Sequence, residues 1–544
     1  MRTRTIRDVD ARWNSAALLA QATLVGPIVL AISAALMWFV SLQKVDIRQT
    51  TDIGLVGLLP PAALAALVIL TASFCLSLHR RPLSAPLLLL HLGALTFMLF
   101  GATTIVEELP RFEPAWRHVG VIEYILRTNQ IDPKIDAYFN WPGFFIFGAL
   151  VTRAAGYHSA IDLLSWAPVF FNLLYLGPLL MIMKAATTDR RVIWLSLWFF
   201  YVTNWIGQDY FAPQALNYFL FLVVLAILLT WFKVTTPAPS ALDQRLQRFG
   251  RVSRWMNWVY EKLTPVDPIH TPCQPWQRGA LMAVLIVVFL IITASHQITP
   301  FFAIGAVTAL VILNRVMPRG LPVLMVVLVG GWIRFMAVTY FSGHVGAVTE
   351  HVGQVSDTVN ANLTSRLLGS PGHLFVVYMR LVMTVAIWGL AFFGGLRRLR
   401  KGYWDLSFVI LMMAPFPFLA LQTYGGELLL RAYLFALPPA AFFAATLFYP
   451  SPSSGRSWKT CAVIGLTSVA LLAGFLFTRY GNEKTDYFTR DEVEALQHLY
   501  EIAKPGSLII AGAHSLPWKF QDYEKYRYQR AEGAMLTANM DEIE

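Results

Sequence analysis

Apolar runs of membrane-spanning length recur along most of the chain and are separated by short polar links. A run of about 20 apolar residues is long enough to cross a hydrocarbon core of roughly 30 Å. About thirteen stretches approach that length, near residues 16–41, 55–78, 87–106, 160–183, 192–208, 215–232, 279–295, 301–316, 321–342, 374–395, 406–424, 428–449 and 460–480. The pattern predicts an all-α polytopic membrane protein with about 13 transmembrane helices.

Two long polar segments interrupt this pattern. Residues 107–159 form a loop rich in carboxylates, guanidinium groups and aromatic rings. Its segment 138–156 is apolar but short, so we expect juxtamembrane helices that lie along the membrane surface. Residues 482–544 combine a helical pattern, with Thr489 as N-cap and Glu492 at the third position, and the strand-like sequence SLIIAGA. We expect a small α/β tail there.

Composition and charge exclude a soluble globular protein. Hydrophobic residues make up 56% of the 544 positions and charged residues only 14%, with a mean hydropathy of +0.54, whereas soluble domains carry about 25% charged residues. The net charge of +11 comes from Lys and Arg in alternate short loops, which orients membrane proteins, so we expect no nucleic-acid partner. The three cysteines lack paired spacing, and neither a disulfide framework nor a cysteine metal site is indicated.

The basic residues place one set of loops in the cytoplasm. These basic segments are the N-terminus and residues 79–81, 189–191, 233–278 and 396–401. The opposite, outer side receives residues 42–54, 107–159, 208–214, 295–300, 343–373, 425–427 and the tail from 482. The N-terminus is therefore expected in the cytoplasm and the C-terminal tail outside.

These features divide the chain into five parts. They are an N-terminal transmembrane hairpin (1–86), a module that carries the long outer loop (87–232), a cytoplasmic loop (233–278), a C-terminal transmembrane module (279–481) and the outer tail (482–544). The cytoplasmic loop contains RLQRFGRVSRWMNWVYEKL, which predicts a basic amphipathic helix on anionic membrane lipid. No internal sequence repeat is evident, which disfavours a transporter built from paired halves.

Two adjacent carboxylates, Glu107 and Glu108, stand where the third predicted span leaves the bilayer. Partial desolvation at that depth raises the pKa of a carboxyl group and suits it to proton abstraction. The alternative is that both are solvated residues that end a helix. A further carboxylate, Asp209, lies in a tight outer turn with Gln208, Tyr210 and Gln214. Such a cluster suits sugar hydroxyls or a divalent cation such as Mg²⁺ or Mn²⁺, but one carboxylate does not define a metal site.

A second group of candidates opens the twelfth predicted span. Arg431 and Tyr433 follow Glu427 by one turn, and a guanidinium at the membrane edge is costly unless it is paired or functional. Arg431 is suited to hold a lipid phosphate through two hydrogen bonds, or it forms a structural pair with Glu427 at i, i+4 spacing. His296 and Gln297 interrupt an apolar hairpin on the same side.

Taken in order, these segments resemble the GT-C superfamily of integral-membrane glycosyltransferases, which use lipid-phosphate-linked sugars. The acidic pair is followed by Phe112 and AWRHVGVIEYI, then by the proline-containing YFNWPGFFIFGALVTRAAG, then by Asp209 in the next outer turn, and late in the chain by RAYLFALPPAAFFAA. GQDYFAPQALNYFL, ASHQITPF and GGELLLRAYLFALP are also similar to segments of bacterial glycosyltransferases of polysaccharide and cell-envelope synthesis. The resemblance covers about residues 87–450, and two departures limit it. Two spans precede the loop instead of one, and the turn at His296 lacks the lysine that some members use for phosphate.

The resemblance implies an inverting glycosyltransferase at the outer face of a bacterial plasma membrane, which moves a sugar from a polyprenyl-phosphate donor to a glycan or lipid-linked acceptor. Residues 87–232 are then a GT-C-like catalytic module. Glu108 or Glu107 is the expected general base, Asp209 is the second acidic residue, and Arg431 with His296 neutralises the departing phosphate. Trp116, Tyr138 and Trp141 are expected to shape the sugar site. The remaining expected substrate contacts are Arg111, His118, Gln208, Tyr210, Gln214, Gln297, Glu427 and Tyr433.

Two other functions are compatible with the sequence. A transporter or flippase of lipid-linked glycans would use Arg334 and Arg380, which are embedded in predicted spans, to line a path for phosphates. Most spans are apolar throughout, however, and the polar candidates gather at one face. A non-catalytic scaffold of a polysaccharide assembly system is the second alternative.

Overall fold

The computed structural model describes residues 25–234, 269, 271–340, 370–420, 427–455, 457–513 and 515–531. Within these residues, eight helices are long and apolar enough to cross a membrane. They are Val25–Leu42, α2 (Pro61–His79), α7 (Ala167–Ala186), α9 (Pro213–Trp231), α12 (Pro275–Ser295), α17 (Pro371–Leu399), α19 (Leu428–Thr446) and α20 (Trp458–Tyr480). The predicted all-α polytopic fold is confirmed.

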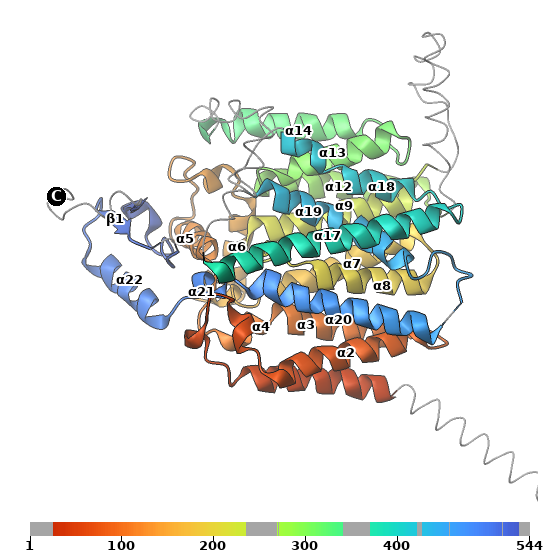
Figure 1. The fold of residues 1–544 in the computed structure, drawn as a ribbon. Helices are drawn as coiled ribbons and strands as arrows, with labels where there is room; N and C mark the ends of the chain where they lie inside the picture. Colours follow the sequence, from red (N-terminus) through yellow and green to blue (C-terminus); the bar gives the residue numbers. More distant parts are fainter. Residues whose placement is uncertain are drawn as a thin grey trace, which may run out of the picture.

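Shorter helices occupy the other predicted spans and run along the same bundle (Figure 1). They are α3 (Ala85–Phe100), α8 (Arg190–Thr203), α13 (Thr299–Ile312), α14 (Leu321–Phe335) and α18 (Leu406–Met413), which is followed by η6 (Phe416–Ala420).

Some predicted boundaries are wrong. The short helices η1 (Ile47–Gln49) and η2 (Leu55–Leu58) precede α2, which starts at Pro61 because proline suits the first helical position. The third predicted span ends early: α3 is capped by Gly101, and the separate helix α4 (Ala102–Val106) follows it.

The centre of the bundle is built on α8 and α19. Every α8 residue from Arg191 to Thr203 is buried, and α19 packs against both α8 and α17. Trp198 of α8 stacks on Phe74 with ring centroids 4.0 Å apart, and its indole Nε1 donates to the Ser468 hydroxyl at 3.1 Å. This packing places the loop after α8 in the middle of one end of the bundle, which is the end that the sequence predicts to be outer.

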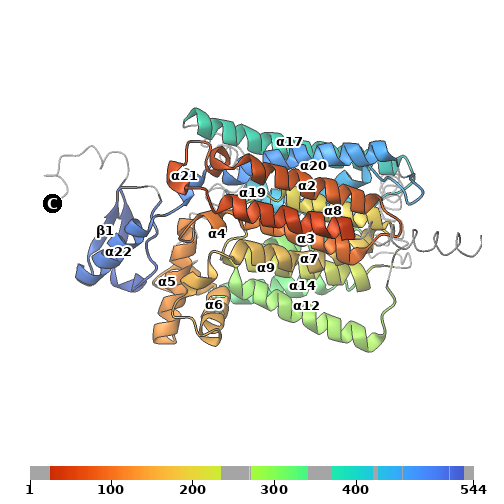
Figure 2. The same cartoon turned by 90° about the horizontal axis from the view of Figure 1, so that it is seen from below.

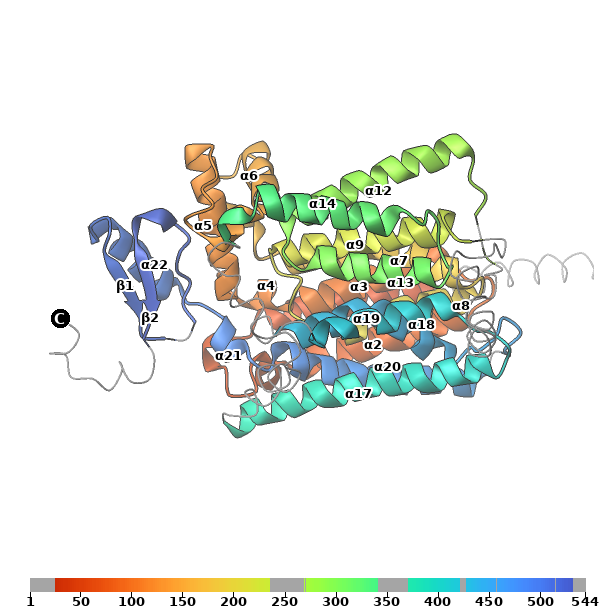
Figure 3. The same ribbon diagram turned by 90° about the horizontal axis from the view of Figure 1, so that it is seen from above.

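Two helices of the outer loop lie across that end. α5 (Glu113–Thr128) and α6 (Gly143–Ala154) run roughly perpendicular to the bundle axis (Figures 2 and 3). The short helices η3 (Ala137–Asn140) and η4 (Ala160–Leu163) flank α6. α6 has only 12 residues and exposes Ile146, Phe147 and Leu150, as expected for the predicted juxtamembrane segment.

The tail forms a small α/β unit beyond α5. Its elements are α21 (Glu483–Asp486), α22 (Arg490–Ile502), β1 (Leu508–Ala511), η8 (Tyr523–Lys525) and β2 (Arg527–Arg530). The two strands pair in parallel, with Leu508 opposite Arg527. The predicted cap of α22 is confirmed, because Thr489 and Glu492 exchange hydrogen bonds as a capping box.

Several contacts seat this unit on α5 (Figure 1). The Trp518 indole donates to the Glu113 carboxylate at 2.9 Å, and Arg127 pairs with Glu524 at 2.5 Å. At Gly120 of α5 the backbone of Lys519 comes so close that an added Cβ would lie 1.8 Å from its carbonyl oxygen. Only glycine allows this approach.

Two predicted features lie outside the described residues. They are the basic amphipathic helix of the cytoplasmic loop (245–263) and the start of the first span (16–24).

Candidate active site

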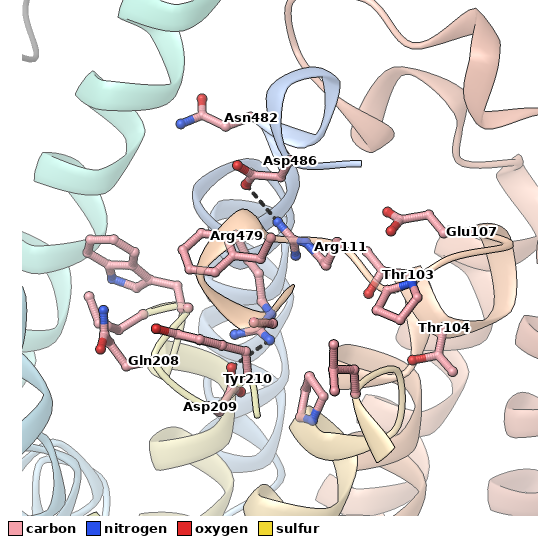
Figure 4. A pocket seen from close by; sticks show the side chains of 18 of the residues that line it. Thr103, Thr104, Glu107, Arg111, Gln208, Asp209, Tyr210, Arg479, Asn482 and Asp486 are labelled. Carbon is pink, nitrogen blue, oxygen red and sulfur yellow. Dashed lines mark hydrogen bonds and ion pairs between the residues drawn. The ribbon is translucent and has the colours of Figure 1, made fainter. Parts of the chain in front are cut away.

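A polar cavity of about 240 Å³ lies at the end of the bundle that is predicted to be outer (Figure 4). Its walls come from the α4–α5 loop, the turn between α8 and α9, α17, the start of α19 and the end of α20. The charged residues that line it are Glu107, Asp209, Glu427, Asp486, Arg111, Arg380 and Arg479. The sequence segments that meet here are therefore hundreds of residues apart.

At the base of the cavity Asp209 is held by two donors. Arg479 Nη2 lies 2.9 Å from Asp209 Oδ1, and Asn172 Nδ2 lies 2.5 Å from Oδ2. Asn172 is itself oriented by Asn204, whose amide donates to its side-chain oxygen at 3.0 Å. Both carboxylate oxygens of Asp209 are thus engaged, and the carboxylate holds the Arg479 guanidinium in place.

Arg479 keeps part of its donor capacity for a ligand. The Asp209 and Arg479 side chains are each only 4% exposed. Arg479 Nε and Nη1 are buried without a close hydrogen-bond acceptor, the guanidinium carbon lies 4.8 Å from the centroid of the Phe100 ring, and Arg479 lines the cavity. A guanidinium offers donors in a planar fork that matches phosphate oxygens, so this edge of the cavity is suited to an anion.

Glu107 stands at the cavity wall, capping the C-terminus of α4. One of its carboxyl oxygens, Oε1, is buried, and the carboxyl groups of Glu107 and Glu483 are close enough to interact through a hydrogen bond. Burial, and then the neighbouring negative charge of Glu483, raise the pKa of Glu107 well above its ordinary value. A carboxylate whose pKa is raised in this way is a stronger base than an ordinary glutamate side chain.

The loop that carries Glu107 is tied to the start of the tail by Arg111. Arg111 Nε lies 2.8 Å from Glu483 and its Nη2 lies 2.9 Å from Asp486. Phe112, which has an unusual positive φ of 81°, donates its backbone N–H to the carbonyl of Asp486 at 2.9 Å. These contacts fix a strained turn of the chain beside the cavity.

Glu108 points away from this cavity. The backbone at Glu107 is extended, so the two consecutive side chains face opposite ways. The Glu108 side chain is 61% exposed and lies 3.6 Å from Arg490. Of the two predicted bases, only Glu107 therefore lines the polar cavity.

Arg431 forms the structural pair that the sequence left open as an alternative. Its Nη2 lies 2.9 Å from Glu427, and its Nη1 lies 3.3 Å from His296 Nε2. The His296 Nδ1 accepts hydrogen bonds from the backbone N–H groups of Ile298 and Thr299. Glu427 lines the cavity, whereas Arg431 and His296 are not among the residues that line it.

Trp116 and His118, two of the predicted contacts, do not line the cavity. Trp116 is fully buried against Phe488 and Phe520, because it lies on the face of α5 that packs inward. His118 stacks on Tyr210, and its Nδ1 lies 2.8 Å from the carbonyl oxygen of Phe211. Burial lowers the pKa of His118 to about 4, so it is a neutral packing residue.

The remaining predicted contacts are divided between the cavity and its surroundings. Gln208, Tyr210 and Arg111 line the cavity. The other five predicted residues lie outside its lining: Gln214, Gln297, Tyr138, Trp141 and Tyr433. Tyr138 contacts the Arg117 guanidinium and Trp141 packs on Tyr340. The sequence analysis missed Arg479, Asn482 and Asp486, although an arginine in the last turn of a predicted span is the same signal that drew attention to Arg431.

An apolar groove of about 490 Å³ adjoins the polar cavity, with Trp205, Arg380 and Leu430 in both walls. The other residues that line it are Val377, Leu381, Thr384, Val385, Trp388, Met413, Phe416, Leu429 and Tyr433. Val385 of α17 is 71% exposed. The Arg380 Nε donates to the carbonyl of Thr478 at 3.1 Å, which holds this guanidinium where the two spaces meet.

Among the described residues, no group of three His, Cys, Asp or Glu side chains is placed to hold a metal ion. The Mg²⁺ or Mn²⁺ dependence stays a prediction.

Comparisons with known proteins give little family information. No protein-family model matches the chain, and no curated protein matches it. Two similar solved structures are both of the oligosaccharyltransferase of Archaeoglobus fulgidus. One is tethered to an acceptor peptide with an NVT sequon; it is 11% identical, with a TM-score of 0.43, and the match covers 87% of this chain and 64% of that one. The other is a complex with Zn and sulfate; it is 13% identical, with a TM-score of 0.41, and the match covers 81% of this chain and 62% of that one. The chain spans less than two thirds of either neighbour.

Proposed function

We propose that the chain is an inverting membrane glycosyltransferase that takes a sugar from a polyprenyl-phosphate donor at the outer face of a bacterial plasma membrane. The observation that carries this proposal is the shared wall between the polar cavity and the apolar groove. A polyprenyl-phosphate sugar joins a charged head to a long apolar chain. Each part needs its own surroundings, because burying a charge in an apolar space is costly.

The phosphate is assigned to Arg479 and Arg380, and the isoprenoid chain to the groove between α17 and α19. Arg479 offers two unused N–H donors beside Asp209, and Arg380 stands at the junction. Fixed guanidinium groups in a buried site stabilise the charge that develops on the leaving phosphate. This assignment moves the phosphate site from Arg431, whose contacts with Glu427 and His296 suit a positioning role.

Glu107 is the general base in this proposal. It accepts the proton of the acceptor hydroxyl while the acceptor oxygen bonds to the anomeric carbon. The bond from that carbon to the phosphate oxygen breaks, and its electron pair leaves with the phosphate. Arg111, Glu483 and Asp486 hold the loop on which Glu107 lies.

A turnover assay tests this function. The protein in lipid nanodiscs is mixed with a panel of synthetic farnesyl-phosphate hexoses and with soluble oligosaccharides as acceptors. Release of farnesyl phosphate, which accompanies transfer of the hexose to an acceptor hydroxyl or to water, is measured. Release is expected for the wild type and for Glu494→Gln, an exposed carboxylate on α22, and it is expected to fall in Glu107→Gln. A flippase or scaffold leaves the sugar–phosphate bond intact, so no release from any donor counts against the proposal.

A further inference from the structure

A second polar cavity, of about 360 Å³, lies on the other side of Glu107. It is lined by Val45, Asp46, Ile47, Arg48, Val106, Glu107, Glu108, Tyr487, Phe488, Thr489 and Arg490. Glu107 is the one residue that this cavity shares with the polar cavity of the donor site. Glu107 therefore stands between the two cavities.

The walls of the second cavity are held together by contacts between distant segments. Gly54 has a φ of +64°, and an added Cβ there would lie 1.9 Å from the carbonyl oxygen of Tyr480. Lys484 pairs with Asp52 at 3.2 Å. The outer loop after the first helix is thus seated on the chain that leads into the tail (Figure 1), and the cavity between them is a built feature.

The chemistry of this cavity differs from that of the apolar groove. Charged side chains from three segments surround it, among them Asp46, Arg48, Glu108 and Arg490. Tyr487 is half-buried and supplies an aromatic ring. Alternating charged groups and an aromatic face suit the hydroxyls and apolar faces of a sugar chain, whereas a lipid tail would strand these charges without water.

We propose that the second cavity is the acceptor entrance, and that the acceptor is a polar, water-exposed glycan that reaches Glu107 from the side opposite the donor. This inference rests on the proposed function. It also gives the tail a role, since residues 487–490 form one wall of the entrance.

The test blocks the entrance with a covalent plug. Arg48→Cys places a thiol at an exposed lining residue, and it is labelled with a polyethylene glycol maleimide. His498→Cys, on α22 and 71% exposed outside the cavity, is the matched control. The wild type, which holds the buried Cys75 and the half-buried Cys273 and Cys461, is treated with the same reagent to measure background labelling.

Sugar transfer is measured from a farnesyl-phosphate hexose to a mixture of soluble oligosaccharides (dextran, mannan and chitin fragments) and, separately, to water. The labelled Arg48→Cys protein is expected to lose about tenfold or more of its transfer to oligosaccharide, because the plug excludes a large acceptor. The rate at which the same plugged protein transfers sugar to water is expected to stay near that of the wild type. When Arg48→Cys is labelled instead with a small methanethiosulfonate, its transfer to oligosaccharide is expected to stay near wild type. The same is expected of the His498→Cys protein labelled with the polyethylene glycol maleimide.

The failures are distinguishable. A wild type without turnover on any donor overturns the proposed function, and this inference falls with it. An active wild type that ignores every oligosaccharide, or one whose plugged variant transfers normally, overturns the acceptor entrance alone.

Discussion

Replacing Asp209 by Asn is expected to destabilise the outer end of the bundle and to abolish donor binding. Asp209 and Arg479 are each 4% exposed and lie 2.9 Å apart. Removing one partner of a buried ion pair costs about 3–5 kcal/mol, because the remaining charge stays buried and uncompensated. Arg479 also loses the carboxylate that holds its fork toward the cavity, so the phosphate site is lost together with the stability.

The free energy of unfolding is measured by titration with sodium dodecyl sulfate in mixed micelles, and donor binding with radiolabelled farnesyl phosphate. The double variant Asp209→Asn/Arg479→Met removes both charges. It is expected to recover most of the lost stability and none of the binding. The reasoning is refuted by a single variant within about 1 kcal/mol of wild type, as for an exposed pair, or by a double variant that binds farnesyl phosphate normally.

Three further predictions follow from the same cavity. Glu107→Gln is expected to lower transfer by about 10²–10⁴-fold and Glu108→Gln by far less, in steady-state assays at saturating donor; equal losses would contradict the assignment of the base. Glu483→Gln removes a negative charge that raises the pKa of Glu107. Because the base must be unprotonated, the acidic limb of the pH–rate profile is expected to move to lower pH. An unmoved limb would refute this coupling. Arg479→Lys keeps the charge but loses the planar fork, so the donor KM is expected to rise by about tenfold or more with little change in folded yield; an unchanged KM would exclude Arg479 from phosphate binding.

Local sequence pattern was sufficient for most of the fold. The apolar runs predicted the long helices, and the short apolar segment 138–156 predicted the short helix α6. The spacing of Thr489 and Glu492 predicted the capping box of α22. Each of these depends on residues that are neighbours in the chain. Helix starts were less predictable, because Pro61 and Gly101 set boundaries inside continuous apolar runs.

The site was only partly predictable, because its decisive contacts join distant segments. Arg479 meets Asp209 across 270 positions, and the order of the helices in the bundle, which brings them together, is absent from local periodicity. The sequence also left Glu107 and Glu108 equivalent. The extended backbone at Glu107 separates them, and Arg111 and Phe112, further along the same loop, contact the tail.

The most direct test of the central claim is photocrosslinking with a benzophenone-bearing farnesyl phosphate in nanodiscs, followed by mapping of the labelled peptides. If the polar cavity and the apolar groove form one donor site, label is expected on the groove residues of α17 and α19, such as Leu381, Val385 and Leu429, and unlabelled farnesyl phosphate is expected to remove it. Label spread over membrane-facing helices such as α14, or label on α17 that no competitor displaces, would contradict the claim.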